Sequence, residues 1–95
     1  MEIYDVIWKD VFAEKIALKH AVSIEEVEDV LFHKSHTRRV NQGNIKGEDV
    51  YVTYGQTSSG RYLVVFFIRK HAAAALPISA RDMTQAERRY YNEQH

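Results

Sequence analysis

The sequence lacks cysteine altogether, so it offers neither a disulfide nor a thiolate ligand for a metal. A single proline and four glycines among 95 residues are too few for a long flexible linker. No apolar run approaches the roughly 20 residues that span a bilayer, and the first residues lack the basic-then-apolar pattern of a secretory signal. We therefore expect a soluble, cytoplasmic protein with one domain over residues 1–95.

The charges balance overall but are unevenly distributed. Thirteen basic and thirteen acidic side chains give a net charge of zero. Residues 1–33 hold three Lys and Arg against eight Asp and Glu, a net of −5. Residues 34–60 hold four against two, and residues 61–95 hold six against three, which gives nets of +2 and +3. The basic part suits a phosphate-bearing partner, and the acidic part suits a basic one.

Three segments are rich in the β-branched and aromatic residues typical of strands: 2–8, 48–57 and 61–70. A fourth segment, 72–79, could suit a helix on its alanines, but its proline and its place after the third segment predict another strand. The third is almost wholly apolar, which indicates a central strand covered on both faces. Pro77 lies in the fourth segment, where it suits an edge or a β-bulge. Because short connections join the last three strands, they are expected to form an antiparallel meander.

The remaining segments predict helices and one loop. Residues 9–21 have apolar spacing nearer to a helix than to a strand. Two capping boxes, Ser23–Glu26 and Thr84–Glu87, predict the starts of two further helices. Residues 33–47 lack periodicity and are expected to form a loop. The order β-α-α-β-β-β-α predicts an α+β fold, a small antiparallel sheet with its helices on one face.

Two groups of residues have the chemistry of a phosphate site. Thr57 and Arg61 flank the expected turn at 58–60, where a hydroxyl and a guanidinium can hold a phosphate together. Arg81 and Arg88 lie around the start of the last helix, whose N-terminus itself attracts anions. The alternatives are an ordinary hairpin with an exposed arginine and a solvated helix face.

The other candidates are less specific. Lys19 and His20 end the first helix, and His20 is either a general acid or base or a histidine favoured by the helix dipole. Of Tyr90 and Tyr91, one is expected in the core, and the other can stack on a base. His33 and His36 have the H-x-x-H spacing of metal ligands but no evident third ligand, so no metal site is predicted.

These motifs occur in a characteristic order. Trp8 is followed by K-H and V-S-x-E-E within 19–26, by G-Q-T-x-x-G-R-Y-L over 55–63 and by I-S-A-R-D-M-T-x-x-E-R-R-x-Y over 78–91. In this order they resemble the BrnT toxins of bacterial type II toxin–antitoxin systems. The resemblance implies a RelE-like ribonuclease fold, RNA cleavage without a metal or other cofactor, and inhibition of translation and growth. It also implies a ribbon-helix-helix, BrnA-like antitoxin encoded nearby, through which alone the toxin meets DNA.

The resemblance also implies roles for particular residues. Arg61 and Arg81 would stabilise the charge that develops on the phosphorus, and Lys19 or His20 would transfer protons. Thr57 would orient a phosphate. Replacing both arginines by alanine is then expected to abolish cleavage and leave the fold intact.

Arg88 and one of the two tyrosines, with Tyr91 preferred, would position the RNA. Two alternatives to a ribonuclease remain. One is a non-catalytic module that binds RNA or a regulator through the same basic surface, and the other is a protein that only pairs with an antitoxin.

Overall fold

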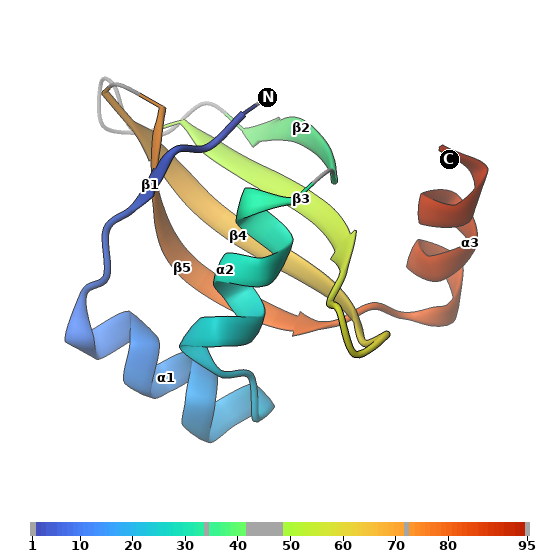
Figure 1. Ribbon diagram of the computed structural model, residues 1–95, viewed down its shortest axis with the longest axis horizontal. Coiled ribbons are helices and arrows are strands. Elements are labelled where there is room, and N and C mark those ends of the chain that lie inside the picture. The colour runs from blue at the N-terminus through green and yellow to red at the C-terminus, as the bar shows by residue number, and fades with distance from the viewer. Residues whose placement is uncertain (1, 34, 42–48, 72, 95) are drawn as a thin grey trace.

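The computed structural model of the protein describes residues 2–33, 35–41, 49–71 and 73–94. Its elements are, in chain order, β1 (Asp5–Val6), α1 (Asp10–His20), α2 (Ile24–Phe32), β2 (His36–Asn41), β3 (Val50–Gln56), β4 (Tyr62–Lys70), β5 (Ala74–Asp82) and α3 (Gln85–Glu93). The strands form one sheet in the order β1-β5-β4-β3-β2 (Figure 1). Strands β2 to β5 are antiparallel neighbours, whereas β1 lies parallel to β5. The expected α+β class and antiparallel meander are therefore confirmed.

A strand lies where a loop was expected. The loop prediction for 33–47 is wrong over β2, which pairs along β3 with His36 opposite Tyr54 and Arg38 opposite Val52. The rest of the expected loop, from residue 42 onward, lies outside the described residues. β2 is an edge strand, and such strands are often charged rather than apolar. Its sequence, HTRRVN, therefore lacks the apolar alternation that signals a strand.

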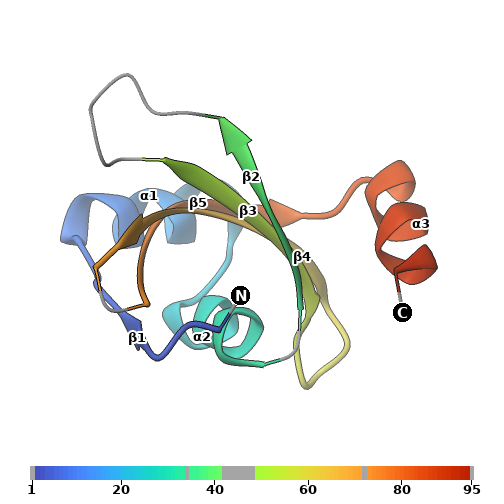
Figure 2. The same ribbon diagram turned by 90° about the horizontal axis from the view of Figure 1, so that it is seen from above.

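Helices lie on both sides of the sheet, α1 and α2 on one side and α3 against one end of the other (Figure 2). The expectation that all helices share one face is therefore wrong. Side chains alternate along β4, so that Leu63 and Val65 point to one face and Val64 to the other. On the first face they pack against α1 and α2 in a core that includes Ile16, Val22, Val27, Val30 and Phe67. We call the opposite side the α3 face; its buried residues are Val52, Tyr54, Val64, Met83 and Tyr91.

Several helix and strand ends lie where local sequence signals predict them. Both capping boxes form, because Ser23 accepts from the Glu26 N–H and Thr84 accepts from the Glu87 N–H, each at 3.1 Å. Pro77 lies at a β-bulge, where the pairing with β4 shifts between Phe66 and Phe67. The first strand is shorter than the expected 2–8. In the described ranges, no helix combines the length and apolar character needed to cross a bilayer.

Glycine has a packing role in β3. Gly55 lies beneath α2, and a Cβ atom built there would be 2.7 Å from Cγ1 of Val30. Real Cβ contacts are longer than this, so the missing side chain lets α2 approach the sheet closely. The hairpin that follows is joined to the same helix, because the backbone N–H and the hydroxyl of Ser58 both donate to Asp29 at 2.7 Å.

Candidate functional site

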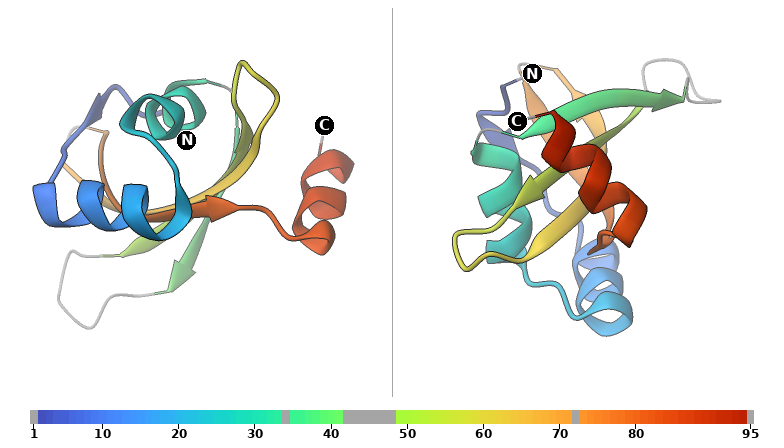
Figure 3. Two further views of the ribbon diagram at one scale, coloured as in Figure 1. Left: turned by 90° about the horizontal axis from the view of Figure 1, so that it is seen from below. Right: turned by 90° about the vertical axis from the view of Figure 1, so that its right-hand side faces the viewer.

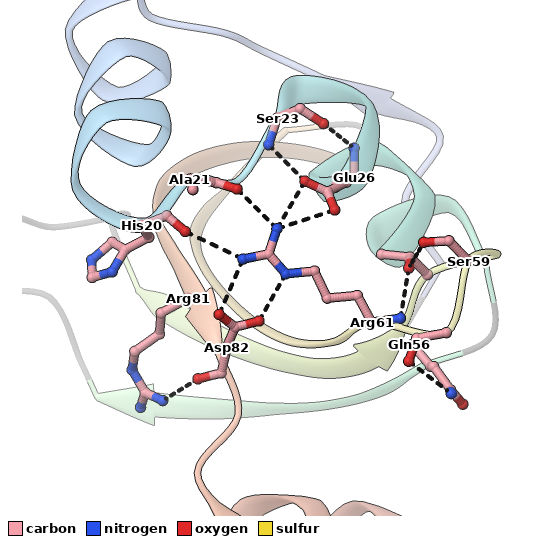
Figure 4. A network of polar contacts seen from close by, with 11 residues as sticks. His20, Ala21, Ser23, Glu26, Gln56, Ser59, Arg61, Arg81 and Asp82 are labelled. Atoms are coloured by element: carbon pink, nitrogen blue, oxygen red, sulfur yellow. Dashed lines mark hydrogen bonds and ion pairs between the residues drawn. The ribbon is translucent and has the colours of Figure 1, made fainter.

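Arg61 lies just before β4, and its side chain joins α1, α2 and β5 (Figure 4). Its Nε and Nη2 donate to the two carboxylate oxygens of Asp82 at 2.7 and 3.0 Å, and Nη1 donates to Glu26 at 3.1 Å. The two Nη atoms also donate to the backbone carbonyls of Ala21 at 2.9 Å and His20 at 3.2 Å. A guanidinium has five N–H groups, and these bonds occupy all of them.

One guanidinium faces two carboxylates in this cluster, and the three groups shift one another's pKa values. The hydrogen bonds to Arg61 are the main cause of the lowered pKa of Asp82. The pKa of Glu26 is also lowered, first by the backbone N–H of Ser23 and further by Arg61. Asp82 and, to a smaller degree, Glu26 raise the pKa of Arg61 in return. Arg61 therefore connects three elements, and its action on a phosphate remains a prediction.

The other residues predicted near Arg61 do lie at this corner. His20 is half-buried, and its positive form would lower the pKa of Asp82, whereas Lys19 is exposed. Thr57 is buried, and its hydroxyl accepts from the backbone N–H of Arg61 at 3.0 Å and contacts the Ser59 hydroxyl at 3.0 Å. The Thr57 hydroxyl thus stabilises the hairpin. Lys19, His20, Thr57 and Arg61 thus lie at one corner, but the side chains of Thr57 and Arg61 form hydrogen bonds within the protein.

Arg81 lies on the α3 face and not beside the Arg61 side chain. It is paired with Val64 in the sheet and lies over the ring of Phe66, with 5.7 Å between the guanidinium carbon and the ring centroid. Its Nη atoms donate to both carboxylate oxygens of Glu87 at 2.7 and 2.9 Å. These bonds, with the backbone N–H of Thr84, lower the pKa of Glu87 to about 2. The two arginines expected to surround one site thus lie on opposite faces. Arg61 binds Asp82, and the side chains of Asp82 and Arg81 alternate because the two residues are neighbours in β5.

A second polar cluster lies on the α3 face between β2, β3 and α3. Nε2 of His36 is 2.7 Å from the hydroxyl of Tyr90, and the Tyr90 ring meets those of His36 and Tyr54 edge-on, with centroids 5.4 and 5.1 Å apart. Arg38 donates to the Tyr54 hydroxyl at 3.2 Å. Figure 3 shows α3 crossing in front of the sheet. The contacts of Tyr90 with His36 and Tyr54 place its side chain beside β2 and β3. Arg81 lies on the same face of the sheet, over the ring of Phe66.

Arg88 of α3 and Tyr62 of β4 extend this surface. Arg88 lies over the ring of Tyr62, with its guanidinium carbon 4.2 Å from the centroid, and Tyr62 meets Tyr91 edge-on at 5.9 Å. Tyr91 is 8% exposed, and burial raises the pKa of its phenol. The tyrosine preferred as the RNA contact is thus the core residue, and Tyr90 is the one beside polar side chains. The reason is the helical turn, which separates consecutive side chains by about 100°.

Sequence reasoning missed three residues of this face: His36, Arg38 and Tyr54. The signal available was the alternation His36–Thr37–Arg38, which places the first and third side chains on one side once the segment is a strand. The H-x-x-H spacing does not produce a shared ligand site, because His33 turns to Asp29 while His36 turns to Tyr90. Within the described ranges, no group of three or more His, Asp or Glu residues could hold a metal ion.

The fold and this face define a small α+β protein with a basic and aromatic surface. Residues 8–87 match the family described as "Ribonuclease toxin, BrnT, of type II toxin-antitoxin system". The crystal structure of the Brucella abortus ribonuclease toxin, BrnT, has the same fold, with a TM-score of 0.66 over 85% of this chain and 97% of that chain at 17% identity. No curated protein sequence shows significant similarity to this chain. The chain belongs to the BrnT family of ribonuclease toxins, and the expected resemblance is confirmed.

Proposed function

We propose that this protein is a metal-independent endoribonuclease toxin that cleaves RNA on the α3 face. The observation that carries the proposal is that two arginines, Arg38 and Arg81, lie against aromatic rings of the α3 face. Arg38 donates to the Tyr54 hydroxyl at 3.2 Å, and the guanidinium carbon of Arg81, from β5, lies 5.7 Å from the centroid of the Phe66 ring. Guanidinium groups keep their charge at every physiological pH and match the geometry of a phosphate.

The proposed reaction is an internal transfer at phosphorus. The ribose 2′ oxygen forms a bond to phosphorus, and the bond from phosphorus to the 5′ oxygen breaks. The 2′-hydroxyl gives its proton to a base, and the departing 5′ oxygen takes a proton from solvent, which leaves a 2′,3′-cyclic phosphate and a 5′-hydroxyl. Arg81 and Arg38 stabilise the added negative charge of the transition state, as oriented donors do in other acyl and phosphoryl transfers.

Neighbouring side chains are suited to hold the RNA strand. Arg88 is exposed over Tyr62, and an arginine stacked on a ring offers both a cation and a flat surface to a nucleotide. Tyr90 belongs to the cluster with His36 and Tyr54, and it replaces Tyr91 as the tyrosine that contacts the RNA. Arg88 and Tyr90 both lie on α3, so this helix is one wall of the proposed RNA site.

The corner around Arg61 is the second candidate for the site. Lys19 and His20 would transfer protons there, and Thr57 and Arg61 would hold the phosphate, as the sequence predicts. We favour the α3 face because the N–H groups of Arg61 are all donated within the protein, and a phosphate would have to displace two carboxylates. Arg81 is paired with one carboxylate, that of Glu87. It was predicted from the sequence as a site residue, and it lies against an aromatic ring of the α3 face.

The family implies an antitoxin partner. We propose that this partner is a ribbon-helix-helix protein encoded nearby, and that the free toxin cleaves RNA in the cytoplasm and inhibits translation. The acidic surface of α2 is the place where a basic antitoxin segment is expected. The alternative is a non-catalytic member that binds RNA or its antitoxin with the same fold.

The test is cleavage of a labelled single-stranded RNA by the purified protein in excess EDTA. We expect cleavage by the wild type and by R69A, a matched control because Arg69 is an exposed arginine on β4. R81A should lose roughly 10²–10³-fold in rate, the cost of one lost transition-state donor. Thermal unfolding of R81A and R81K shows whether the lower cleavage rate results from a destabilised fold. Binding without cleavage by the wild type would support the non-catalytic alternative.

A further inference from the structure

The His36–Tyr90 pair has the geometry of a general base and the group that orients it. We propose that Nδ1 of His36 accepts the proton of the ribose 2′-hydroxyl and that the Tyr90 hydroxyl positions the imidazole. This assignment rests on the proposed ribonuclease function and names the base that the reaction needs. It replaces neither arginine, since the imidazole acts on the attacking oxygen and the guanidinium groups act on the phosphate.

The position of His36 is set by three elements. Its backbone lies in β2 opposite Tyr54 of β3, which fixes the residue on the α3 face. The ring is held between the Tyr54 ring, at a centroid distance of 6.5 Å, and the Tyr90 ring, at 5.4 Å. The side chain is half-buried, which leaves part of the ring accessible to a substrate. A base must be held in this way to meet a hydroxyl in one geometry.

The hydrogen bond to Tyr90 occupies Nε2, so Nδ1 is the ring nitrogen that can meet a substrate. A neutral imidazole has one N–H donor and one acceptor nitrogen. When Nε2–H donates to the Tyr90 oxygen, 2.7 Å away, the lone pair of Nδ1 is available to take a proton. No described residue forms a hydrogen bond with Nδ1. Tyr90 thereby acts as the orienting group does in other base-catalysed sites, because its hydroxyl holds the ring in one position.

Charged and titratable groups face His36 from each element packed against it. Tyr90 comes from α3, Tyr54 from β3 and Arg38 from its own strand. The positive charge of Arg38 favours the deprotonated 2′ oxygen of a bound RNA. The neighbourhood is thus suited to taking a proton from that oxygen.

The competing role is purely structural, with His36 fastening α3 to β2. In that role, loss of the ring would loosen α3, and the pH dependence of any activity would not change. The two roles therefore differ in kinetics and not only in stability. A general base contributes typically 10²–10⁴-fold to a rate.

The experiment measures cleavage of a labelled single-stranded RNA against pH, in EDTA, for the wild type, H36Q, H36A and Y90F. H33A is the control, because His33 is an exposed histidine that contacts Asp29 at the end of α2. A DNA of the same sequence, which lacks the 2′-hydroxyl, measures binding without cleavage. Urea unfolding of each variant measures stability.

We expect the wild type and H33A to gain rate as pH rises from about 5 to about 8, because a general base must be neutral to accept a proton. H36Q should lose roughly 10²–10⁴-fold and the pH-dependent rise, yet bind the DNA like the wild type. Added imidazole should restore part of the rate of H36A and none of that of Y90F, whose own imidazole remains in place.

Two results would overturn the assignment of His36 as the base and leave the proposed ribonuclease function standing. One is an H36Q enzyme with the wild-type rate and pH profile. The other is a loss of rate that matches a loss of stability and DNA binding, with no rescue of H36A by imidazole. An inactive wild type that still binds the DNA would overturn the ribonuclease function itself, and the base assignment with it.

Discussion

Arg61 offers the sharpest test of how the fold is held together. R61A would leave the carboxylates of Glu26 and Asp82 and two backbone carbonyls without their common donor. Breaking a buried ion pair costs about 3–5 kcal/mol, and a net hydrogen bond to a charged group about 1.5–3 kcal/mol. The Arg61 side chain is 26% exposed and that of Asp82 is 62% exposed, so water would partly replace the lost bonds. We therefore expect a loss of about 3 kcal/mol.

The assay is urea and thermal unfolding followed by circular dichroism. For a domain of this size, a loss of about 3 kcal/mol lowers the melting temperature by roughly 12–24 °C. The control is R39A, because the Arg39–Asp49 pair at 3.3 Å is exposed on both sides and should contribute about 0–1 kcal/mol. Equal, small losses in R61A and R39A would refute the reasoning. They would also restore the expectation from sequence that R61A spares the fold and affects cleavage alone.

Two further changes test the packing and charge of the fold. E87Q keeps the α3 capping box but removes the charge paired with Arg81, so we expect about 1 kcal/mol less stability at pH 7 in urea unfolding. The folded pKa of Glu87 is about 2, below its usual value, so its contribution is present above about pH 4.5 and is lost as pH falls toward 2. E87Q should lack that acid-sensitive part, and an unchanged pH profile would contradict it. G55A should cost about 1–3 kcal/mol, because the added Cβ meets Val30, and a wild-type melting temperature would be incompatible with that contact.

The fold was predictable where the signal is local. The two capping boxes and the apolar run of β4 identify helix starts and a central strand without knowledge of neighbours. β2 was not predictable in this way, because an edge strand takes its backbone partners from β3 and needs no apolar pattern. The place of α3 was hidden for a related reason. Its sequence is mostly polar, and only Tyr91 and the preceding Met83 tell which face it covers.

The candidate site was likewise predictable only where the signal is local. The sequence indicated arginines near one strand-to-helix corner, and Arg81 does lie at that corner. It could not show that Arg61 and Arg81 serve opposite faces, because that depends on strand alternation and on the carboxylates that each arginine meets. It also could not show His36 as part of the site, because its partner Tyr90 lies 54 residues away in the sequence.

The sequence by itself determined the class of fold, the order of most elements and the family, because these depend on periodicity, caps and short motifs within continuous segments. The tertiary structure decided which arginine side chains can contact a phosphate. Arg61 is occupied because α1, α2 and β5 bring it two carboxylates and two carbonyls, whereas the α3 face gathers histidine, tyrosine and arginine from four elements. The physical reason is that hydrogen-bond saturation and side-chain convergence depend on distances across the fold, and no local pattern encodes those distances.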